Sequence, residues 1–280
     1  MSAPVPPPLR IPYPPPIVVK VGGSAGIDRA AVASDLASLV QEGERVVLVH
    51  GASAETDVLA ASLGHPARTI VSPSGQQSRR TDRRTLEIFA MAALGVETFS
   101  YVELLKRAGT QPLGLFGLLV GRRKDVRAVQ DGRTVLLRDD YTGRVEEIPV
   151  SLVWKILDDG WIPVLPPLAL SPHGEGLNVD GDRAAAAIAA ALGAKTLVIL
   201  TNVPGLLRSV EDPASLVASA TLEEAEALAQ GRMKKKAMAA REALEAEVSR
   251  VVIASGRVGR PVSRALAGEG TVIGKAVAAR

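Results

Sequence analysis

The stretch IVVKVGGSAGI, residues 17–27, carries a lysine within a run of strand-forming residues and two glycines shortly after it. A charged side chain on a buried strand is costly unless it has a partner. Lys20 precedes its glycines, whereas the lysine of a Walker A loop follows them, and the GxGxxG fingerprint of dinucleotide-binding sites is absent here. Taken alone, the stretch leaves two interpretations open: Lys20 extends its ammonium group to solvent, or it contacts a ligand.

A second strand and turn follow the first along the chain. VHGASAET, residues 49–56, ends a strand with Gly51-Ala52-Ser53, much as the first strand ends with Gly22-Gly23-Ser24. Ligands of open α/β sheets bind at the carboxyl ends of the strands, where small residues let backbone N–H groups approach an anion. Tight turn geometry explains either turn alone. The two turns together favour an anionic ligand.

The rest of the chain alternates apolar strands with amphipathic helices. Strands are predicted at 17–21, 45–50, 161–170, 195–201 and 250–256, and helices at 28–41, 53–63, 181–194, 221–231 and 233–247. This alternation is typical of a mostly parallel sheet with helices on both faces, which is the α/β class. The pattern changes at 122–148, where Asp131-Gly132 predicts a β-hairpin turn.

Prolines mark two places along the chain. Residues 1–16 are rich in proline, which blocks both helices and sheet ladders and predicts a tail. Further prolines between 166 and 172 predict a boundary between two lobes. The predicted organisation is a tail at 1–16, an N-terminal lobe at 17–170 and a C-terminal lobe at 171–280.

Composition narrows the class of protein. Of the 280 residues, 47% are hydrophobic, which is enough for a full core, and the formal net charge is only +3. That mild charge and an aromatic content of 3% argue against nucleic-acid binding. The chain has no cysteine, which excludes disulfides, thiolate metal sites and a cysteine nucleophile. No run approaches the roughly 18 apolar residues that cross a bilayer and no signal-peptide pattern is present, so we expect a cytoplasmic protein that binds no membrane.

Four further segments gather polar residues. SRRTDRRT, residues 78–85, contains four arginines, of which most are expected to face solvent and one is suited to clamp a carboxylate. NVDGD, residues 178–182, opens a helix, and its polar residues act either as caps or in a site. LTNVPGL, residues 200–206, closes a strand with a polar turn that is suited to a nucleotide. GRMKKK, residues 231–236, places lysines at a helix start, where the helix dipole disfavours cations, and so favours a phosphate partner.

In this order and combination, KVGG, HGAS, SRRTD, NVDGD, LTNVPGL, GRMKKK and GEGT resemble the amino acid kinase superfamily, within its acetylglutamate kinase branch, over about residues 17–274. More narrowly, GHPARTIVSPSGQQSRRTDRRTLEIF, VGRRK, DDYTGRVEE and GRMKKK resemble the aminoadipate kinases of bacterial lysine biosynthesis. The resemblance implies a three-layer αβα sandwich of the carbamate kinase-like fold, with a substrate-binding N-terminal lobe and a nucleotide-binding C-terminal lobe. It also implies ATP with Mg²⁺, a homodimer, and a small acidic amino-group carrier protein of the LysW type that bears the substrate.

The reaction implied by the resemblance is ATP-dependent phosphorylation of the side-chain carboxylate of carrier-linked α-aminoadipate, giving an acyl phosphate. The implied catalytic residues are Lys20, Lys236 and Asp182, with the aspartate orienting both lysines. The implied substrate-binding residues are Gly51, Ala52, Arg79 and Asn178, and the implied nucleotide-binding residues are Gly22, Gly23, Thr201, Asn202, Val203 and Gly205. The basic run Arg122, Arg123 and Lys124 would contact the carrier, and no residue is assigned to a metal. Phosphoryl transfer depends mainly on positioning and electrostatic stabilisation, so we expect Lys20 at a strand end because a phosphoryl group is its partner.

Two departures from the branch bear on substrate geometry. Ala52 stands where the branch has a second glycine, and GLFG, residues 114–117, replaces GLSG ahead of a shortened stretch. An N-acetylglutamate kinase of arginine biosynthesis, or a dual enzyme of both pathways, is the first alternative function. Glutamate and aminoadipate differ by one methylene, worth only about 1 to 3 kcal/mol in a pocket. A non-catalytic nucleotide sensor is the second alternative, and the intact Lys20, Asp182 and Lys236 speak against it.

Overall fold

The computed structural model describes residues 14–75 and 77–274, so most of the predicted tail lies outside the described residues. An eight-stranded sheet has the order β14-β16-β15-β13-β1-β2-β10-β5. Its strands are β1 (Ile17–Val21), β2 (Val46–His50), β5 (Gln111–Gly114), β10 (Trp161–Leu165), β13 (Thr196–Thr201), β14 (Ser219–Ala220), β15 (Arg250–Ser255) and β16 (Thr271–Gly274). Neighbouring strands are parallel except β15 and β16. The predicted mostly parallel sheet is therefore confirmed.

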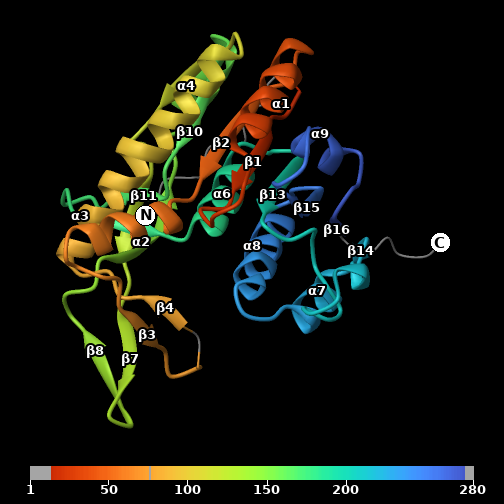
Figure 1. Ribbon diagram of the computed structural model, residues 1–280. Helices are drawn as coiled ribbons and strands as arrows, with labels where there is room; N and C mark the ends of the chain where they lie inside the picture. The colour runs from red at the N-terminus through yellow and green to blue at the C-terminus, as the bar shows by residue number, and fades with distance from the viewer. Residues whose placement is uncertain (1–13, 76, 275–280) are drawn as a thin grey trace, which may run out of the picture.

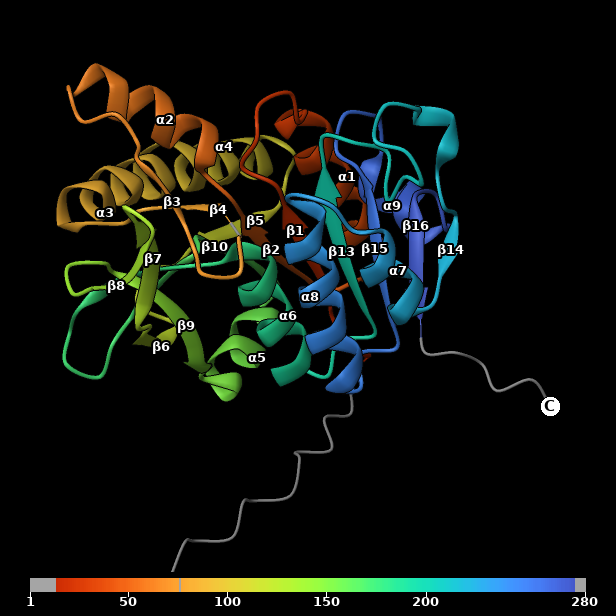
Figure 2. The ribbon, with the colours of Figure 1, turned by 90° about the horizontal axis from the view of Figure 1, so that it is seen from below.

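Helices cover both faces of this sheet (Figure 2). One face packs against α1 (Arg29–Gln41), α4 (Phe99–Arg107) and α9 (Pro261–Leu266). The other packs against α5 (Val150–Asp158), α6 (Gly181–Ala191), α7 (Leu222–Leu228) and α8 (Met233–Glu245). Beyond them, α2 (Ser53–Ser62) and α3 (Arg83–Ala90) share a third, smaller core cluster. The three-layer αβα sandwich expected from the resemblance is confirmed.

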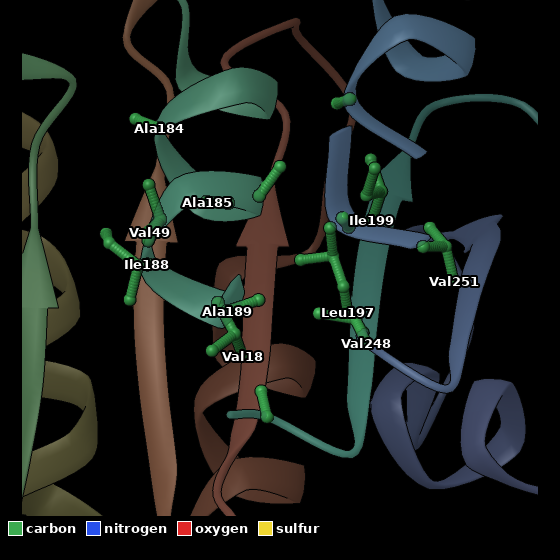
Figure 3. Packing of buried hydrophobic residues seen from close by; sticks show 14 of the residues in the cluster. Val18, Val49, Ala184, Ala185, Ile188, Ala189, Leu197, Ile199, Val248 and Val251 are labelled. Carbon is green, nitrogen blue, oxygen red and sulfur yellow. The ribbon is translucent and has the colours of Figure 1, made fainter. Parts of the chain in front are cut away.

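The central strand β1 is buried at all five positions because helices lie on both sides of it. Side chains alternate along a strand, so Val19 packs on the α1 face and Val18 packs beneath α6. Figure 3 shows Val18 close to the alanine-rich side of α6, where Ala185 and Ala189 let the helix approach the sheet. Lys20 follows the same alternation and therefore lies on the α6 face.

A small closed barrel and two hairpins complete the fold. The barrel consists of β6 (Val120–Arg123), β9 (Thr142–Glu147), β11 (Leu168–Leu170) and β12 (Gly176–Val179). The hairpins β3 (Thr69–Val71) with β4 (Gln77–Arg79) and β7 (Val126–Gln130) with β8 (Arg133–Leu137) extend at one end of the molecule (Figure 1). The predicted turn at Asp131-Gly132 is confirmed, with φ values of 49° and 74° that fit a type I′ turn.

A continuous helical run, Arg83–Arg107, joins α3 to α4 through a π-helical segment, η1 (Met91–Thr98). Within the described ranges this run is the one helix that is long and apolar enough to cross a membrane. Core helices pass the same test, and Ile88, Ala92 and Tyr101 of the run are buried in the fold. This finding does not test the expectation that the protein binds no membrane, which stays a prediction.

The boundary between two lobes at 170/171 also remains a prediction. β1 belongs to the first predicted lobe and β13 to the second, and they pair from Ile17 with Thr196 to Val21 with Leu200. One sheet thus continues through both predicted lobes, and the carboxyl ends of β1 and β13 lie side by side.

Gly23 is required where the turn after β1 packs on the turn after β2. A Cβ at Gly23 would lie 2.3 Å from the backbone nitrogen of Ala52. We expect Gly23→Ala to lower the free energy of unfolding by about 1–3 kcal/mol through overpacking, as measured by urea unfolding. Gly259→Ala is the matched control, because a Cβ there meets nothing within 4 Å, and should change that free energy by under about 0.5 kcal/mol. Equal effects of the two substitutions would contradict this account of the turn.

Candidate active site

Lys20 is enclosed by the start of α6. The side chain is buried, with 6% of the residue exposed, so the interpretation that its ammonium group extends to solvent is wrong. Its Cε lies 3.4 Å from the position that a Cβ would take at Gly181. Its Nζ forms an ion pair with Oδ1 of Asp182 at 2.7 Å. The partner of this buried lysine within the chain is therefore a carboxylate on the helix above the strand.

The first turn of α6 positions Asp182. Asp180 caps the helix, and its Oδ1 accepts hydrogen bonds from the backbone N–H groups of Asp182 and Arg183. The other oxygen of Asp182, Oδ2, accepts a hydrogen bond from Nζ of Lys236 at 2.9 Å. The sequence left capping and a site as alternatives for this segment, and the structure contains both: Asp180 is the cap, and Asp182 bridges two lysines.

The group formed by Lys20, Asp182 and Lys236 has an excess positive charge in a buried place. Burial alone would raise the pKa of Asp182, but the charges and hydrogen bonds of the two lysines hold that pKa well below its usual range. Burial and then the charge of Lys20 lower the pKa of Lys236, while Asp182 opposes the shift. Lys236 also stands in the first turn of α8, where the helix dipole disfavours a cation. An anion at this point would balance the buried positive charge and would also offset the unfavourable helix dipole at Lys236.

Arg79 reaches the same edge of the sheet from β4. Its Nη2 forms an ion pair with Oδ1 of Asp57 at 2.6 Å and donates to the carbonyl oxygen of Ser53 at 3.3 Å. Its Nη1 is buried and has no hydrogen-bond partner among the described residues. A buried donor without an acceptor is unfavourable, so this side chain is arranged to take one more acceptor.

The other three residues predicted to bind substrate lie at the ends of β2 and β12. Asn178 donates from Nδ2 to Oγ1 of Thr81 at 3.1 Å, which fixes its amide. Gly51 directly follows β2, and its N–H donates to the carbonyl oxygen of Val21 at 2.8 Å. Ala52 is buried in the cluster beneath α2 and α3, so its methyl group has a packing role there.

The predicted nucleotide-binding residues come from two neighbouring turns. The N–H of Gly22 donates to the carbonyl oxygen of Leu200 at 2.9 Å, which places Gly22 and Gly23 beside the turn that contains Thr201, Asn202, Val203 and Gly205. In that turn Gly205 has a packing role, because a Cβ there would lie 2.6 Å from Oγ1 of Thr271. Arg232 donates to Oγ of Ser24 at 3.1 Å and so ties the first turn to the start of α8.

The basic run predicted to contact a carrier does not form a single face. Arg122 is exposed on β6 and forms an ion pair with Glu146 at 3.0 Å. Arg123 points to the opposite side of the strand, where it donates to the carbonyl oxygen of Asp140 at 2.7 Å and lies 4.4 Å from the ring centroid of Tyr141. The alternation of side chains along β6 separates the two arginines, so they do not share a face, and contact of the run with a carrier stays a prediction.

Lys124 is close enough to the start of α6 to interact with its charges. Burial and then the charge of Arg183 lower its pKa, while the nearby charge of Asp180 raises it. These neighbours belong to the first turn of α6, immediately beside Asp182. Lys124 therefore stands at the rim of the candidate site, whereas Arg123 supports the loop between β8 and β9.

His50 is a buried residue at the site that the sequence analysis left without a role. Its ring stacks on Tyr101 with centroids 5.8 Å apart, and Nε2 lies 2.7 Å from Oγ1 of Thr98 in the π-helix. Burial is the main cause that lowers the pKa of His50 to about 4, so the ring is neutral at pH 7. The motif HGAS contained this residue, but nothing in the local sequence indicated its partner on a distant helix.

Known proteins share this arrangement of segments. The sequence model of the Amino acid kinase family matches residues 15–255. The chain is 51% identical over 267 residues to the [LysW]-aminoadipate kinase of Thermus thermophilus, covering 92% of this chain and 99% of that protein. It is 34% identical over 254 residues to the acetylglutamate kinase of Moorella thermoacetica, covering 86% and 84%. Among solved structures, N-acetylglutamate synthase from Neisseria gonorrhoeae complexed with coenzyme A and N-acetyl-glutamate matches with a TM-score of 0.78 and 28% identity, covering 93% of this chain and 59% of that one.

Removing the carboxylate between the two lysines should destabilise the fold. Asp182→Asn leaves Lys20 and Lys236 buried without a counter-charge, so we expect a loss of about 3–5 kcal/mol in unfolding free energy at pH 7. The pKa of Asp182 is depressed in the folded state, so its contribution is present above about pH 4 and is lost as the pH falls further. In urea unfolding, the difference between variant and wild type should shrink below that pH.

The matched control for this substitution is Asp158→Asn, which breaks an ion pair with Arg45 that is partly exposed. It should cost under about 1 kcal/mol, because solvent screens such a pair. A loss in Asp182→Asn no larger than in this control would contradict the account of two buried cations held by one anion.

Proposed function

Because the chain belongs to the amino acid kinase family, we propose that it transfers the γ-phosphoryl group of ATP to the side-chain carboxylate of α-aminoadipate borne on an acidic carrier protein of the LysW type. The observation that carries the chemistry is the buried group of Lys20, Asp182 and Lys236, with its excess positive charge at the carboxyl edge of the sheet. The substrate is proposed from the 51% identity to the aminoadipate kinase of Thermus thermophilus. The place of the enzyme is then in lysine biosynthesis.

In the proposed reaction, a carboxylate oxygen of the substrate attacks the γ-phosphorus of ATP, and the bond from that phosphorus to the oxygen bridging the β-phosphate breaks. ADP leaves with the electron pair, and the product is an acyl phosphate. The carboxylate is already ionised at pH 7, so no general base is required. Lys20 and Lys236 would stabilise charge on the transferring group, and Asp182 holds both ammonium groups in place.

Mg²⁺ would neutralise part of the charge of the β- and γ-phosphates. No group of three or more His, Asp or Glu side chains that could hold a metal occurs within residues 14–75 and 77–274. We therefore expect the ion to be held mainly by phosphate oxygens of the nucleotide, which is the usual preference of Mg²⁺ in kinases. The nucleotide itself would border Thr201, Asn202, Val203 and Gly205 of the C-terminal lobe, together with Gly22 and Gly23 from the turn after β1.

Substrate recognition is proposed at the N-terminal lobe, together with Asn178 from the start of the C-terminal lobe. The unpartnered Nη1 of Arg79 is suited to a carboxylate of the substrate, since guanidinium groups match carboxylates in geometry. The amide of Asn178 would meet the polar groups of the substrate, and the backbone at Gly51 and Ala52 would approach its reacting end. A homodimer is also proposed, because the helical run Arg83–Arg107 exposes large apolar side chains, among them Met91 and Phe99.

An N-acetylglutamate kinase of arginine biosynthesis, or an enzyme of both pathways, is the second candidate function. The observation in its favour is the 34% identity to the acetylglutamate kinase of Moorella thermoacetica. A cytoplasmic location is proposed with either function. A nucleotide sensor without activity is the weakest candidate, because such a protein does not need two buried lysines held by one aspartate.

A hydroxamate assay of acyl phosphate formation tests the function. The full-length protein should turn over carrier-linked aminoadipate with the highest kcat/KM, ahead of carrier-linked glutamate and acetylglutamate. Lys20→Ala should lower kcat roughly 10²- to 10³-fold with a much smaller change in the KM for ATP, because the lysine meets charge that develops during transfer. Lys195→Ala, an exposed lysine just before β13, is the control and should leave kcat unchanged. Preference for acetylglutamate would favour the second candidate function, and a normal kcat for Lys20→Ala would remove Lys20 from the mechanism.

Charges at the rim of the site should matter for the carrier and not for a small substrate. We expect the double variant Arg122→Gln/Lys124→Gln to lower kcat/KM for the carrier-linked substrate while acetylated amino acids are unaffected, since both charges would steer an acidic protein. Added salt should narrow the difference, because such interactions are screened over about 8 Å at physiological ionic strength. Arg123 is left intact because of its contacts with the fold.

Arg107 is an exposed arginine on α4, and Arg107→Gln is the control for a general effect of charge. It should leave kcat/KM unchanged for both the carrier-linked and the acetylated substrate. An equal loss with both substrates would assign Lys124 to catalysis. If kcat/KM falls with neither substrate, Arg122 and Lys124 do not help to dock the carrier.

A further inference from the structure

A cavity of about 280 Å³ lies on the side of the β1 turn that faces α2 and α4. Its lining residues are Gly22, Gly23, Ser24, Ala25, Gly26, Ile27, Arg29, Ala54, Glu55, Val58, Glu97 and Tyr101. None of Lys20, Asp182, Lys236, Arg79 and Asn178 lines it. The cavity therefore shares only the glycine turn with the candidate active site.

The charges that line the cavity do not balance. Arg29 forms an ion pair with Glu55 at 2.8 Å, and its Nε lies 3.5 Å from Oε2 of Glu97. One guanidinium thus stands between two carboxylates. Glu97 comes from the π-helix η1, is 5% exposed, and forms no hydrogen bond with any described residue. A buried carboxylate without hydrogen bonds is unfavourable, and burial, as the largest cause, raises the pKa of Glu97 to about 7.

Tyr101 supplies a second unsatisfied group at the same place. It is 1% exposed and lines the cavity, and its hydroxyl has no hydrogen-bond partner within the part of the chain that the structure describes. Burial raises the pKa of Tyr101, and the next cause is the negative charge of Glu97, so the two groups are near each other. Buried hydroxyls normally have a partner. A donor placed between Glu97 and Tyr101 would satisfy both.

We propose that this cavity binds a small aliphatic primary ammonium ion through the carboxylates of Glu97 and Glu55 and the hydroxyl of Tyr101. An ammonium group offers three donors, which equals the number of these acceptors. Ile27 and Val58 line the same cavity and provide apolar contact for a short alkyl chain. The volume suits a ligand of a few heavy atoms. A metal ion fits less well, because Arg29 lies between the two carboxylates and no metal-ligand group is found among the described residues.

Binding there would act on the turn that the active site also uses. Gly22 and Gly23 form one wall of the cavity, and Ser24 accepts a hydrogen bond from Arg232 at the start of α8. An ion that bridges Glu55 on α2 and Glu97 on the π-helix would fix the walls opposite this turn. The consequence is a more ordered glycine turn beside Lys20.

Isothermal titration of the full-length protein with n-butylammonium chloride tests this proposal, with n-butanol as the uncharged match. We expect saturable binding of one butylammonium per chain and no binding of butanol. Glu97→Gln should weaken binding at least about tenfold, because it removes a charge-assisted hydrogen bond in a buried place. Tyr101→Phe should weaken it by a smaller factor and keeps the ring that stacks on His50.

Glu103→Gln is the matched control, since Glu103 lies on α4 near Tyr101 but forms an exposed pair with Arg107. It should bind butylammonium as the wild type does. Absence of saturable binding by the wild type, or equal affinity of the wild type and Glu97→Gln, would overturn the proposal. Thermal unfolding of each variant establishes that it is folded. If Glu97→Gln does not fold, the affinity of Tyr101→Phe for butylammonium tests the proposal in its place.

The pH dependence gives a further readout that does not depend on a substitution. Glu97 ionises with a pKa of about 7, whereas butylammonium keeps its charge, so affinity should rise up to about tenfold from pH 6 to pH 8. The other titratable groups around the cavity are Arg29, Glu55, Asp28 and Tyr101, and His50 stays neutral over that range. An affinity that is constant or falls over this range would count against binding through Glu97.

Discussion

The bridge that Asp182 makes between Lys20 and Lys236 is the interaction on which the rest of the site depends. Burying three charges is expensive, and replacing a buried ion-pair group by apolar residues often leaves a protein equally stable or more so. The group is therefore better explained by a ligand than by stability. Two cations held by one anion keep one positive charge unbalanced, which is the condition that favours a phosphoryl group.

The packing of α6 and α8 on one face of the sheet allows this bridge. Lys20 comes from the middle of the sheet, Asp182 from α6 and Lys236 from α8, and both helices lie on one face. The alanines of α6 let it approach β1 closely, as Figure 3 shows for Ala185 and Ala189. A larger residue there would lift the helix and lengthen the ion pair. The small side chains of one core cluster thus determine a distance between charged groups at the sheet edge.

Local pattern was sufficient to predict the elements that bury a continuous apolar face. The strand at Ile17–Val21, the alanine-rich helix and the Asp131-Gly132 turn each have a chemical signature within a few residues. The π-helix at Met91–Thr98 has no such signature in its local sequence, and its contacts include the distant helix α2. The separation of Arg122 from Arg123 was readable from strand alternation, once the segment is known to be a strand.

The site was predictable where a motif carries its own chemistry, and not where separate segments meet. Lys20 and Asp182 lie in motifs, whereas Arg29, Glu55 and Glu97 come from three helices whose sequences do not mark them. The glycine turn after β1 joins the two groups, since one of its sides meets the α6 face and the other meets the cavity. A turn of small residues with charged groups on both sides cannot shift toward one without moving away from the other. A ligand that orders one side would therefore also restrict the backbone beside Lys20, with no direct contact between the two groups.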